Sequence, residues 1–177
     1  PETPFLVPMD NAELLNKHGI NNTLELNWGQ QITLANLTIT CLPAQHSSKR
    51  GIGDTRKALW ASWAVSSAEK RFYFGGDSAY FSGYQLTGEV LGPFDLVALP
   101  IGAYAPRAMM QASHMNPEEA IQAALDLKAR AILPIHYGTF DLSDEPLDEP
   151  LKRFNEAPLN PHAPARIPLR IGESHAF

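Results

Sequence analysis

The stretch Asn116-Pro-Glu-Glu-Ala-Ile-Gln-Ala-Ala-Leu-Asp-Leu-Lys-Ala-Arg-Ala-Ile-Leu-Pro-Ile-His136 predicts a helix followed by a strand. Asn116 is a residue type that caps helix N-termini, Pro117 suits the first helical position, and apolar residues then repeat at helical spacing to residue 129. The short apolar segment 131–135 has the length of a strand. A helix joined this closely to a strand is typical of an α/β domain.

The flanking sequence extends this pattern in both directions. Before residue 77 the apolar residues alternate as in antiparallel strands, and after it helices and strands alternate. The expected strands are residues 5–7, 23–26, 31–42 with a turn at 35–36, 59–65, 71–74, 96–99, 131–135 and 167–171. The other expected helices are residues 10–18, 81–91 and 147–154.

Composition narrows the class of protein. The chain has 177 residues, 44% hydrophobic and 19% charged, which is the size and composition of one globular domain. Its net charge of −5 argues against nucleic-acid binding, which needs a basic face. The single cysteine, Cys41, lies in an apolar run, so we expect it to be buried and unpaired.

Cellular location is only partly indicated. No apolar stretch approaches the ~20 residues of a membrane-spanning helix, so we expect a cytoplasmic or peripherally membrane-associated protein. The chain opens without an initiator Met, and we expect further sequence before it, in which a targeting segment cannot be judged.

Three residues of metal-ligand type each follow an apolar run: His46, Asp77 and His136. Because the carboxyl ends of neighbouring strands meet at one edge of a sheet, we expect these side chains to converge within roughly 7 Å. The pair Gly75-Gly76 permits a close backbone approach just before Asp77. Imidazole with carboxylate suits zinc or iron better than calcium, and zinc is our first choice.

Each signal also has a simpler interpretation when taken alone. A histidine after a strand is most often exposed or internally bonded, and Gly-Gly-Asp is common in turns. We assign His18, His162 and His175 to such surface positions, because they lie at a helix end or in terminal and proline-rich segments.

Several motifs resemble the metallo-β-lactamase superfamily, and within it the N-acyl-phosphatidylethanolamine-hydrolysing phospholipase D type and its bacterial relatives. The resemblance runs from about residue 4 to about residue 150 in one order and with similar spacing. The motifs are PAQHSSKR at 43–50, LWASW at 59–63, FYFGGDSAY at 72–80, GPFDLVALPIGAYAPR at 92–107, HMNPEEA at 114–120 and IHYGTF at 135–140.

The resemblance implies a fold and a ligand set. It makes His46 the third histidine of one zinc site, Asp77 the carboxylate bridging two zincs, and His136 the histidine of the second zinc. The superfamily's leading motif, His-x-His-x-Asp-His, is absent from the sequence. From this resemblance we therefore expect residues 1–177 to form the second half of an αββα sandwich, a mixed sheet with helices on its outer face. The N-terminal half, on the same or a separate polypeptide, would complete the site and its two zincs.

The implied activity is zinc-dependent hydrolysis of a small-molecule or lipid phosphodiester by a metal-bridging hydroxide, without a side-chain nucleophile. Asp77 would act in catalysis. His114 could contact the phosphate or protonate the leaving group, or simply cap the next helix. Arg107 could pair with a phosphate or with an internal carboxylate. Lys49 and Arg50 could attract an anionic head group or be solvated surface charges.

Two alternatives remain open from the sequence. One is a lactonase or other ester hydrolase of the same fold, resembling the ascorbate-6-phosphate lactonase branch. The other is a non-catalytic fragment whose site is vacant. Whichever function applies, half of a sandwich cannot bury both faces of its sheet, so we expect a large apolar face that the absent half or another chain would cover.

Overall fold

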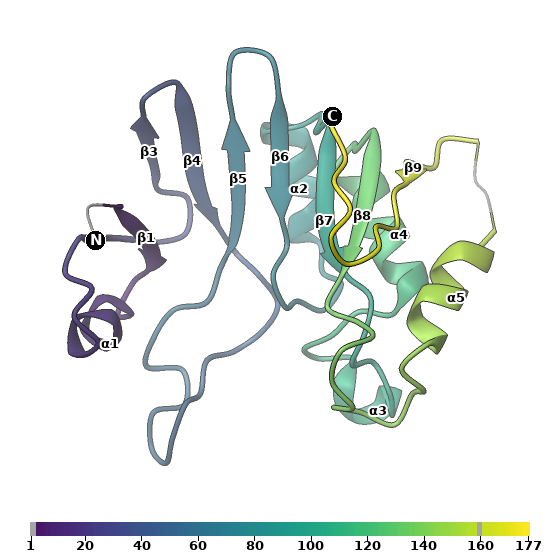
Figure 1. Cartoon of the computed structure of the whole chain (residues 1–177), viewed down its shortest axis with the longest axis horizontal. Coiled ribbons are helices and arrows are strands. Elements are labelled where there is room, and N and C mark those ends of the chain that lie inside the picture. The colour runs from purple at the N-terminus through teal and green to yellow at the C-terminus, as the bar shows by residue number, and fades with distance from the viewer. Residues whose placement is uncertain (1–2, 159–160) are drawn as a thin grey trace.

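A computed structural model describes residues 3–158 and 161–177, which form a mixed sheet with helices packed on it (Figure 1). The seven-stranded sheet has the order β3-β4-β5-β6-β7-β8-β9. Its strands are β3 (Gln31–Leu34), β4 (Leu37–Leu42), β5 (Ser62–Ser66), β6 (Arg71–Phe74), β7 (Leu96–Pro100), β8 (Ala131–Ile135) and β9 (Ala165–Arg166).

Strand direction changes along the sheet where the sequence pattern changes. The pairs from β3 to β6 are antiparallel, and those from β6 to β9 are parallel. The carboxyl ends of β4, β6, β7 and β8 consequently meet at the lower edge of the sheet in Figure 1. The predicted α/β class is confirmed.

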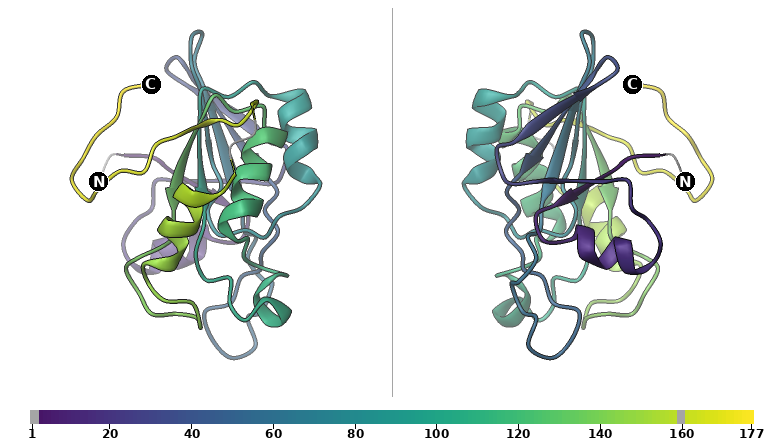
Figure 2. Two further views of the ribbon diagram at one scale, coloured as in Figure 1. Left: turned by 90° about the vertical axis from the view of Figure 1, so that its right-hand side faces the viewer. Right: turned by 90° about the vertical axis from the view of Figure 1, so that its left-hand side faces the viewer.

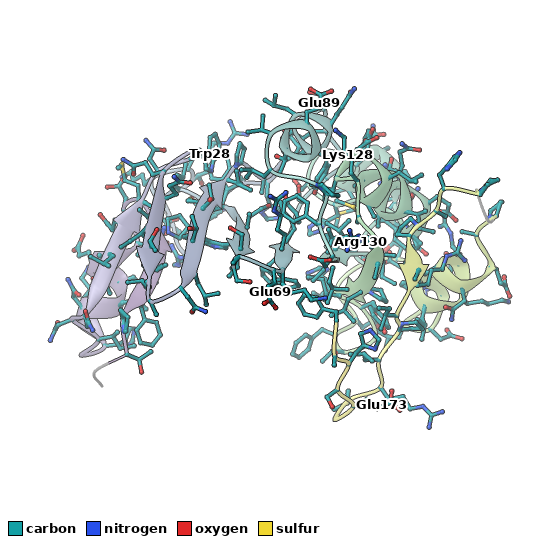
Figure 3. All side chains as sticks on the ribbon, turned by 90° about the horizontal axis from the view of Figure 1, so that it is seen from above. Trp28, Glu69, Glu89, Lys128, Arg130 and Glu173 are labelled. Atoms are coloured by element: carbon teal, nitrogen blue, oxygen red, sulfur yellow. The ribbon has the colours of Figure 1, made fainter. Side chains whose placement is uncertain are left out.

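The helices lie mainly on one face of this sheet. In Figure 2, α2 (Gly83–Val90) and α4 (Pro117–Asp126) cover one face, and the C-terminal residues cross the other. Viewed from above, Glu89 and Lys128 lie on the helix side and Glu173 on the far side (Figure 3). The remaining elements are α3 (Arg107–Met110), α5 (Glu149–Glu156), α1 (Ala12–Lys17) and a separate parallel pair, β1 (Phe5–Pro8) with β2 (Thr23–Leu26).

Helix α4 begins as the sequence predicts. The Asn116 side chain accepts a hydrogen bond from the Glu119 N–H (2.8 Å), and the Glu119 carboxylate accepts one from the Asn116 N–H (2.9 Å), which completes a capping box. The helix ends at Asp126 rather than at residue 129, because Lys128 adopts a left-handed conformation with φ of 56°.

The core lies between the sheet and the α2–α4 layer. Tyr73 of β6 is buried against Tyr84 and Phe94, with ring centroids 6.2 and 5.6 Å away. Helices α2 and α4 approach closely at Gly88, where a Cβ would collide with the Asp126 carbonyl oxygen. This packing fixes α4, and with it the segment that precedes α4, against the sheet.

The opposite face of the sheet is also apolar. Trp63 is paired with Cys41 on one side and Phe74 on the other, and strand alternation directs all three away from the helix layer. Phe74 is 42% exposed, and Phe177 of the C-terminal tail packs near Phe72 with ring centroids 6.0 Å apart. This face is therefore only partly covered. Cys41 is buried and free, as predicted.

Two expected strands differ from the structure. The closing strand at 167–171 is wrong: β9 ends at Arg166, Ile167 donates one last hydrogen bond to Ile132, and Pro168 has no N–H to continue the ladder. The strand expected at 59–65 begins only at Ser62, because the Leu59 N–H donates outside the sheet, to the Met9 carbonyl. Helix α3 is a single turn that the apolar pattern does not reveal.

Candidate metal centre

Three imidazoles and one carboxylate converge at the lower edge of the sheet. Nε2 of His136 lies 3.4 Å from Oδ2 of Asp77. The His114 ring centroid lies 5.1 Å from that of His46 and 5.4 Å from that of His136. The structure therefore brings together the three residues expected from strand ends, with His114 between the two other histidines.

Asp77 is positioned by the close approach of β6 to β7. The Gly75 N–H donates to the Ala98 carbonyl (2.8 Å), and a Cβ at Gly75 would lie 2.9 Å from the Leu99 side chain. Gly76 then adopts a left-handed conformation with φ of 60°. The glycine pair thus turns the chain at the strand end and leaves the Asp77 carboxylate at the sheet edge, half-exposed.

His46 is joined directly to the segment that carries Asp77. The Gln45 N–H donates to Ser78 Oγ, and the Ala79 N–H donates to the Gln45 carbonyl, each over 2.9 Å. Nδ1 of His46 lies 2.8 Å from the Ser47 carbonyl, which can only accept, so Nδ1 carries the proton. Nε2 is left as the nitrogen with a lone pair, the arrangement typical of metal-binding histidines.

His136 has an unusual backbone for a non-glycine residue, with φ of 58°. The Ile101 N–H donates to the Ile135 carbonyl (3.0 Å), and a Cβ at Gly102 would collide with the His136 carbonyl. Gly102 is therefore required for the close contact between the segments that follow β7 and β8. Backbone strain of this kind concentrates at functional sites.

The pKa values of His136 and His114 shift in opposite directions. The hydrogen bond to Asp77 raises the pKa of His136, and the same contact with His136 lowers the pKa of Asp77. Burial lowers the pKa of His114, and the neighbouring His46 and His136 lower it further. The contact with Asp77 thus favours the charged form of His136, whereas burial favours the neutral form of His114.

The structure distinguishes the roles left open for Arg107. Its Nη1 donates to the His114 carbonyl (3.0 Å) and its Nη2 to Glu119 Oε1 (2.7 Å), so it forms the internal pair. Arg50 donates from Nη2 to Asn11 (2.9 Å), and the neighbouring Lys49 is exposed. The structure gives no contact that assigns these residues to a substrate.

The three histidines expected at the surface lie on other segments of the chain. His18 is the C-cap residue of α1. His162 and His175 are exposed.

A cavity of about 230 Å³ adjoins the cluster, with His136 in its wall. Phe140, Leu142 and Leu147 line it although they are 74, 66 and 45% exposed. The segment that carries them is held by Glu145, whose carboxylate accepts hydrogen bonds from the N–H groups of Tyr104 (3.2 Å) and Ala105 (2.9 Å). Sequence reasoning missed Glu145, because nothing in the polar segment around it indicates burial.

The side chains of the cluster are of the types that bind metal ions, but they do not by themselves make up a full set of ligands. Buried Nδ1 atoms of His114 and His136 have no hydrogen-bond partner among the described residues, which is uncommon for buried polar atoms. Within residues 3–158 and 161–177, however, no three His, Cys, Asp or Glu side chains are arranged to hold an ion. Catalytic zinc usually takes three protein ligands, so these side chains fit as part of a larger ligand set.

Comparison with known proteins identifies the family to which this fold belongs. Residues 3–137 match the family described as the beta-lactamase superfamily domain, and the chain belongs to this superfamily. The resemblance predicted from the motifs is confirmed.

Individual curated proteins are also similar in sequence to this chain. The chain is 40% identical over 172 residues to N-acyl-phosphatidylethanolamine-hydrolyzing phospholipase D 1 of Caenorhabditis elegans, covering 89% of this chain and 48% of the relative. It is 34% identical over 128 residues to a UPF0173 metal-dependent hydrolase of Caldivirga maquilingensis, covering 72% and 49%. The chain thus spans about half the length of these curated relatives.

Solved structures confirm the fold. The metallo hydrolase Igni18 of Ignicoccus hospitalis superposes with a TM-score of 0.73 at 24% identity, covering 97% of this chain and 67% of that one.

Across the described part of the chain, no helix combines the length and the apolar character needed to cross a membrane.

Proposed function

We propose that the full-length protein is a zinc-dependent phosphodiesterase of the phospholipase D-like type, and that residues 1–177 supply one half of its catalytic domain. The observation that carries this proposal is the convergence of His46, Asp77 and His136, with 3.4 Å between Nε2 of His136 and the Asp77 carboxylate. Imidazole and carboxylate ligands together suit zinc.

The remaining ligands would come from a second half of the fold. Support comes from the length of the relatives, of which this chain spans about half, and from the lack of a His-x-His motif in this sequence. The partly covered apolar face around Trp63 and Phe74 is the surface on which a second sheet would pack.

This chain's residues would each have a defined task. Asp77, Nε2 of His46 and the imidazole of His136 in its neutral form would hold a pair of zinc ions. When bound, such a pair supplies an acidified water and counter-charge for the transition state. The lowered pKa of Asp77 keeps its carboxylate ionised at neutral pH. Burial and the histidine neighbours lower the pKa of His114, and its neutral imidazole would donate a ring N–H to the phosphate of the substrate.

The cavity beside His136 supports a substrate with an apolar part. Exposed apolar side chains such as Phe140 and Leu142 gain by covering an acyl or alkyl group. The small polar ring of a sugar lactone would leave them in water. We therefore prefer a lipid-like phosphodiester to a lactone, in keeping with the substrate in the name of the C. elegans relative.

The test is turnover by the full-length protein of N-acyl-phosphatidylethanolamine, a small chromogenic phosphodiester and a lactone. Asp77→Asn and His136→Ala should each lower phosphodiester turnover by at least about a hundredfold, since each removes a metal ligand. The matched controls are Asp148→Asn and His175→Ala at exposed positions. Full phosphodiester turnover in the Asp77 or His136 variant, or turnover of the lactone alone, would reject the proposal.

A further inference from the structure

We infer that Arg107 is a positioning residue that holds His114 in the cluster by tying it to the start of α4. This inference rests on the proposed function for its catalytic consequence, but its structural content can be tested separately. It concerns a link that joins α3, the segment carrying His114 and the buried helix α4.

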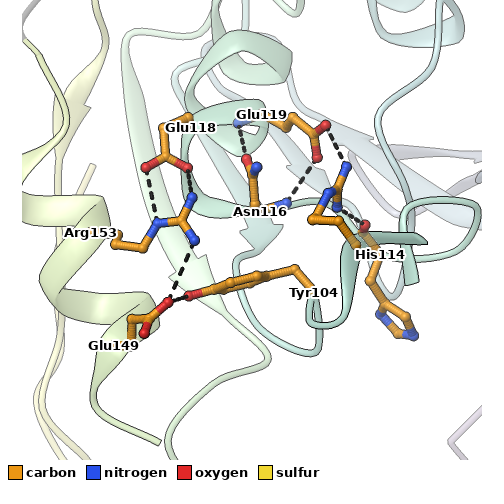
Figure 4. Close-up of polar contacts among 8 residues, drawn as sticks. Tyr104, His114, Asn116, Glu118, Glu119, Glu149 and Arg153 are labelled. Carbon is orange, nitrogen blue, oxygen red and sulfur yellow. Dashed lines mark hydrogen bonds and ion pairs between the residues drawn. The ribbon is translucent and has the colours of Figure 1, made fainter. Parts of the chain in front are cut away.

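Arg107 uses its two terminal nitrogens on two different partners. Nη1 donates to the backbone carbonyl of His114 (3.0 Å), and Nη2 donates to Glu119 Oε1 (2.7 Å). In Figure 4 the dashed lines that end on His114 and on the outer oxygen of Glu119 mark these two contacts. About one third of each side chain, Arg107 and Glu119, is exposed. Partial burial and a charged hydrogen bond make this link stronger than an ordinary surface ion pair.

The carboxylate of Glu119 anchors the other end of the link. Oε2 accepts from the Asn116 N–H (2.9 Å), so the oxygen that binds Arg107 and the oxygen that closes the capping box belong to one group. Helix α4 itself is rigidly placed, because Ala120 and Ala124 are fully buried in the core. Arg107 therefore fixes His114 to an element that cannot readily move.

His114 needs support through its backbone. Its buried Nδ1 has no hydrogen-bond partner among the described residues, so this nitrogen does not orient the ring. Its N–H donates to the Met110 carbonyl (2.8 Å), and the next N–H, of Met115, donates to the Ser78 carbonyl (3.1 Å). Arg107 supplies the bond to the remaining backbone group of His114, its carbonyl.

The planar guanidinium is suited to this task. Its two terminal nitrogens reach two acceptors at a fixed separation, whereas a lysine would place one point charge on a flexible stem. One N–H of each terminal nitrogen of Arg107 is already bonded to an acceptor within the protein, so the guanidinium is held in an internal network rather than left unpaired for a phosphate. This arrangement favours support of His114 over contact with the substrate.

The chain contains a matched control at Glu118, the residue just before Glu119 in the same helix. Glu118 accepts from Arg153 Nη2 (2.6 Å) and Nε (3.1 Å), a link that is at least as tight as that of Glu119. It joins α4 to α5, beside the Tyr104–Glu149 hydrogen bond, and His114 lies on the other side of α4's first turn in Figure 4. Glu118→Gln thus removes a similar ion pair from the first turn of α4, one that leads to Arg153 of α5 rather than to Arg107.

The first measurement is steady-state turnover by the full-length protein with a phosphodiester. Arg107→Ala and Glu119→Gln should lower kcat about tenfold or more and leave KM within about twofold, because His114 loses alignment while substrate binding remains. Arg107→Lys should recover part of the loss. Glu118→Gln should match the wild type; a loss equal to that of Glu119→Gln would show a general effect of helix stability and overturn the inference.

The second measurement asks whether Arg107 acts through His114. In a His114→Ala background, Arg107→Ala should cause no further loss of kcat, because the group that it positions is gone. An undiminished loss in that background would mean that Arg107 acts directly on the substrate, which overturns the inference.

The third measurement does not depend on activity. In the metal-free full-length protein, the ring ¹H–¹³C resonances of His114 should shift or broaden in Arg107→Ala and remain unchanged in Glu118→Gln. Unchanged His114 resonances in Arg107→Ala would overturn the inference. If the protein hydrolyses no phosphodiester, the proposed function fails, and this result still decides the role of Arg107.

Discussion

The His136 imidazole contacts the Asp77 carboxylate over 3.4 Å although the two residues follow strands that are not neighbours. Strand β7 lies between β6 and β8 in the sheet, and all three run parallel. The contact forms because the chain turns sharply at Gly76 and approaches the His136 carbonyl closely at Gly102. The sheet edge is thus shaped by glycines so that polar side chains meet over the end of β7.

Gly88→Ala should destabilise the full-length protein. Alanine normally stabilises a helix interior by about 0.5–1 kcal/mol over glycine, but here the new Cβ would collide with the Asp126 carbonyl. Overpacking of this kind costs about 1–3 kcal/mol, so the net effect is a loss. Urea unfolding is the measurement, with Leu86→Ala at an exposed position of α2 as the control. A gain in stability for Gly88→Ala would contradict the α2–α4 packing.

Glu145 should make stability depend on pH. Burial raises its pKa, but the Ala105 N–H and a hydrogen bond with Ser143 outweigh burial and hold the pKa below 4.5, its ordinary value. A carboxyl with a lowered folded pKa stabilises above its unfolded pKa and loses that contribution as the pH falls through the folded pKa. Glu145→Gln should therefore cost about 1–3 kcal/mol at pH 7 and clearly less near pH 3.5.

The measurement for Glu145 is urea unfolding of both proteins at the two pH values. Glu173→Gln at an exposed position is the control and should show no comparable difference. The same gap between wild type and Glu145→Gln at both pH values would show that the ionised form is not the one that is stabilised.

Phe140→Ala should weaken binding of substrates with long apolar groups. Burial of a large apolar side chain is worth about 1.5–3 kcal/mol, so KM for a long-chain phosphodiester should rise roughly tenfold. KM for a small chromogenic diester should not change. Met109→Ala, at a position 75% exposed and outside the cavity wall, is the control. An equal effect of Phe140→Ala on both substrates would exclude the cavity as the binding site of the apolar group.

Cys41 should be chemically inert in the folded protein. Burial raises the pKa of its thiol to about 11, and the side chain is fully buried. Alkylation at pH 8, followed by mass spectrometry of the Cys41 peptide, should detect modification only after unfolding. Rapid modification of the native protein would show that this face of β4 opens readily.

Much of the fold is predictable from local patterns. The segment from Asn116 carries its own cap, first-turn proline and apolar stripe, and the strand at 131–135 follows at once. The strand expected at 167–171 fails because alternation of apolar residues cannot show that Pro168 interrupts a ladder, or which strand would be its neighbour.

The site is predictable only in its strand-end residues. His46, Asp77 and His136 each follow a readable strand, so topology alone brings them together. The links that support them join segments far apart in sequence, such as Glu145 to Ala105, and no local pattern marks their partners. Arg107 and Glu119 are both visible as charges, but only the folded loop shows that they bind each other.

The metal content of the purified full-length protein tests the central claim most directly. Elemental analysis should find about two zinc ions per wild-type chain and per Asp148→Asn chain, and a clear loss of zinc in Asp77→Asn. Zinc bound equally by the wild type and Asp77→Asn would contradict the account, because Asp77 would then not be a ligand.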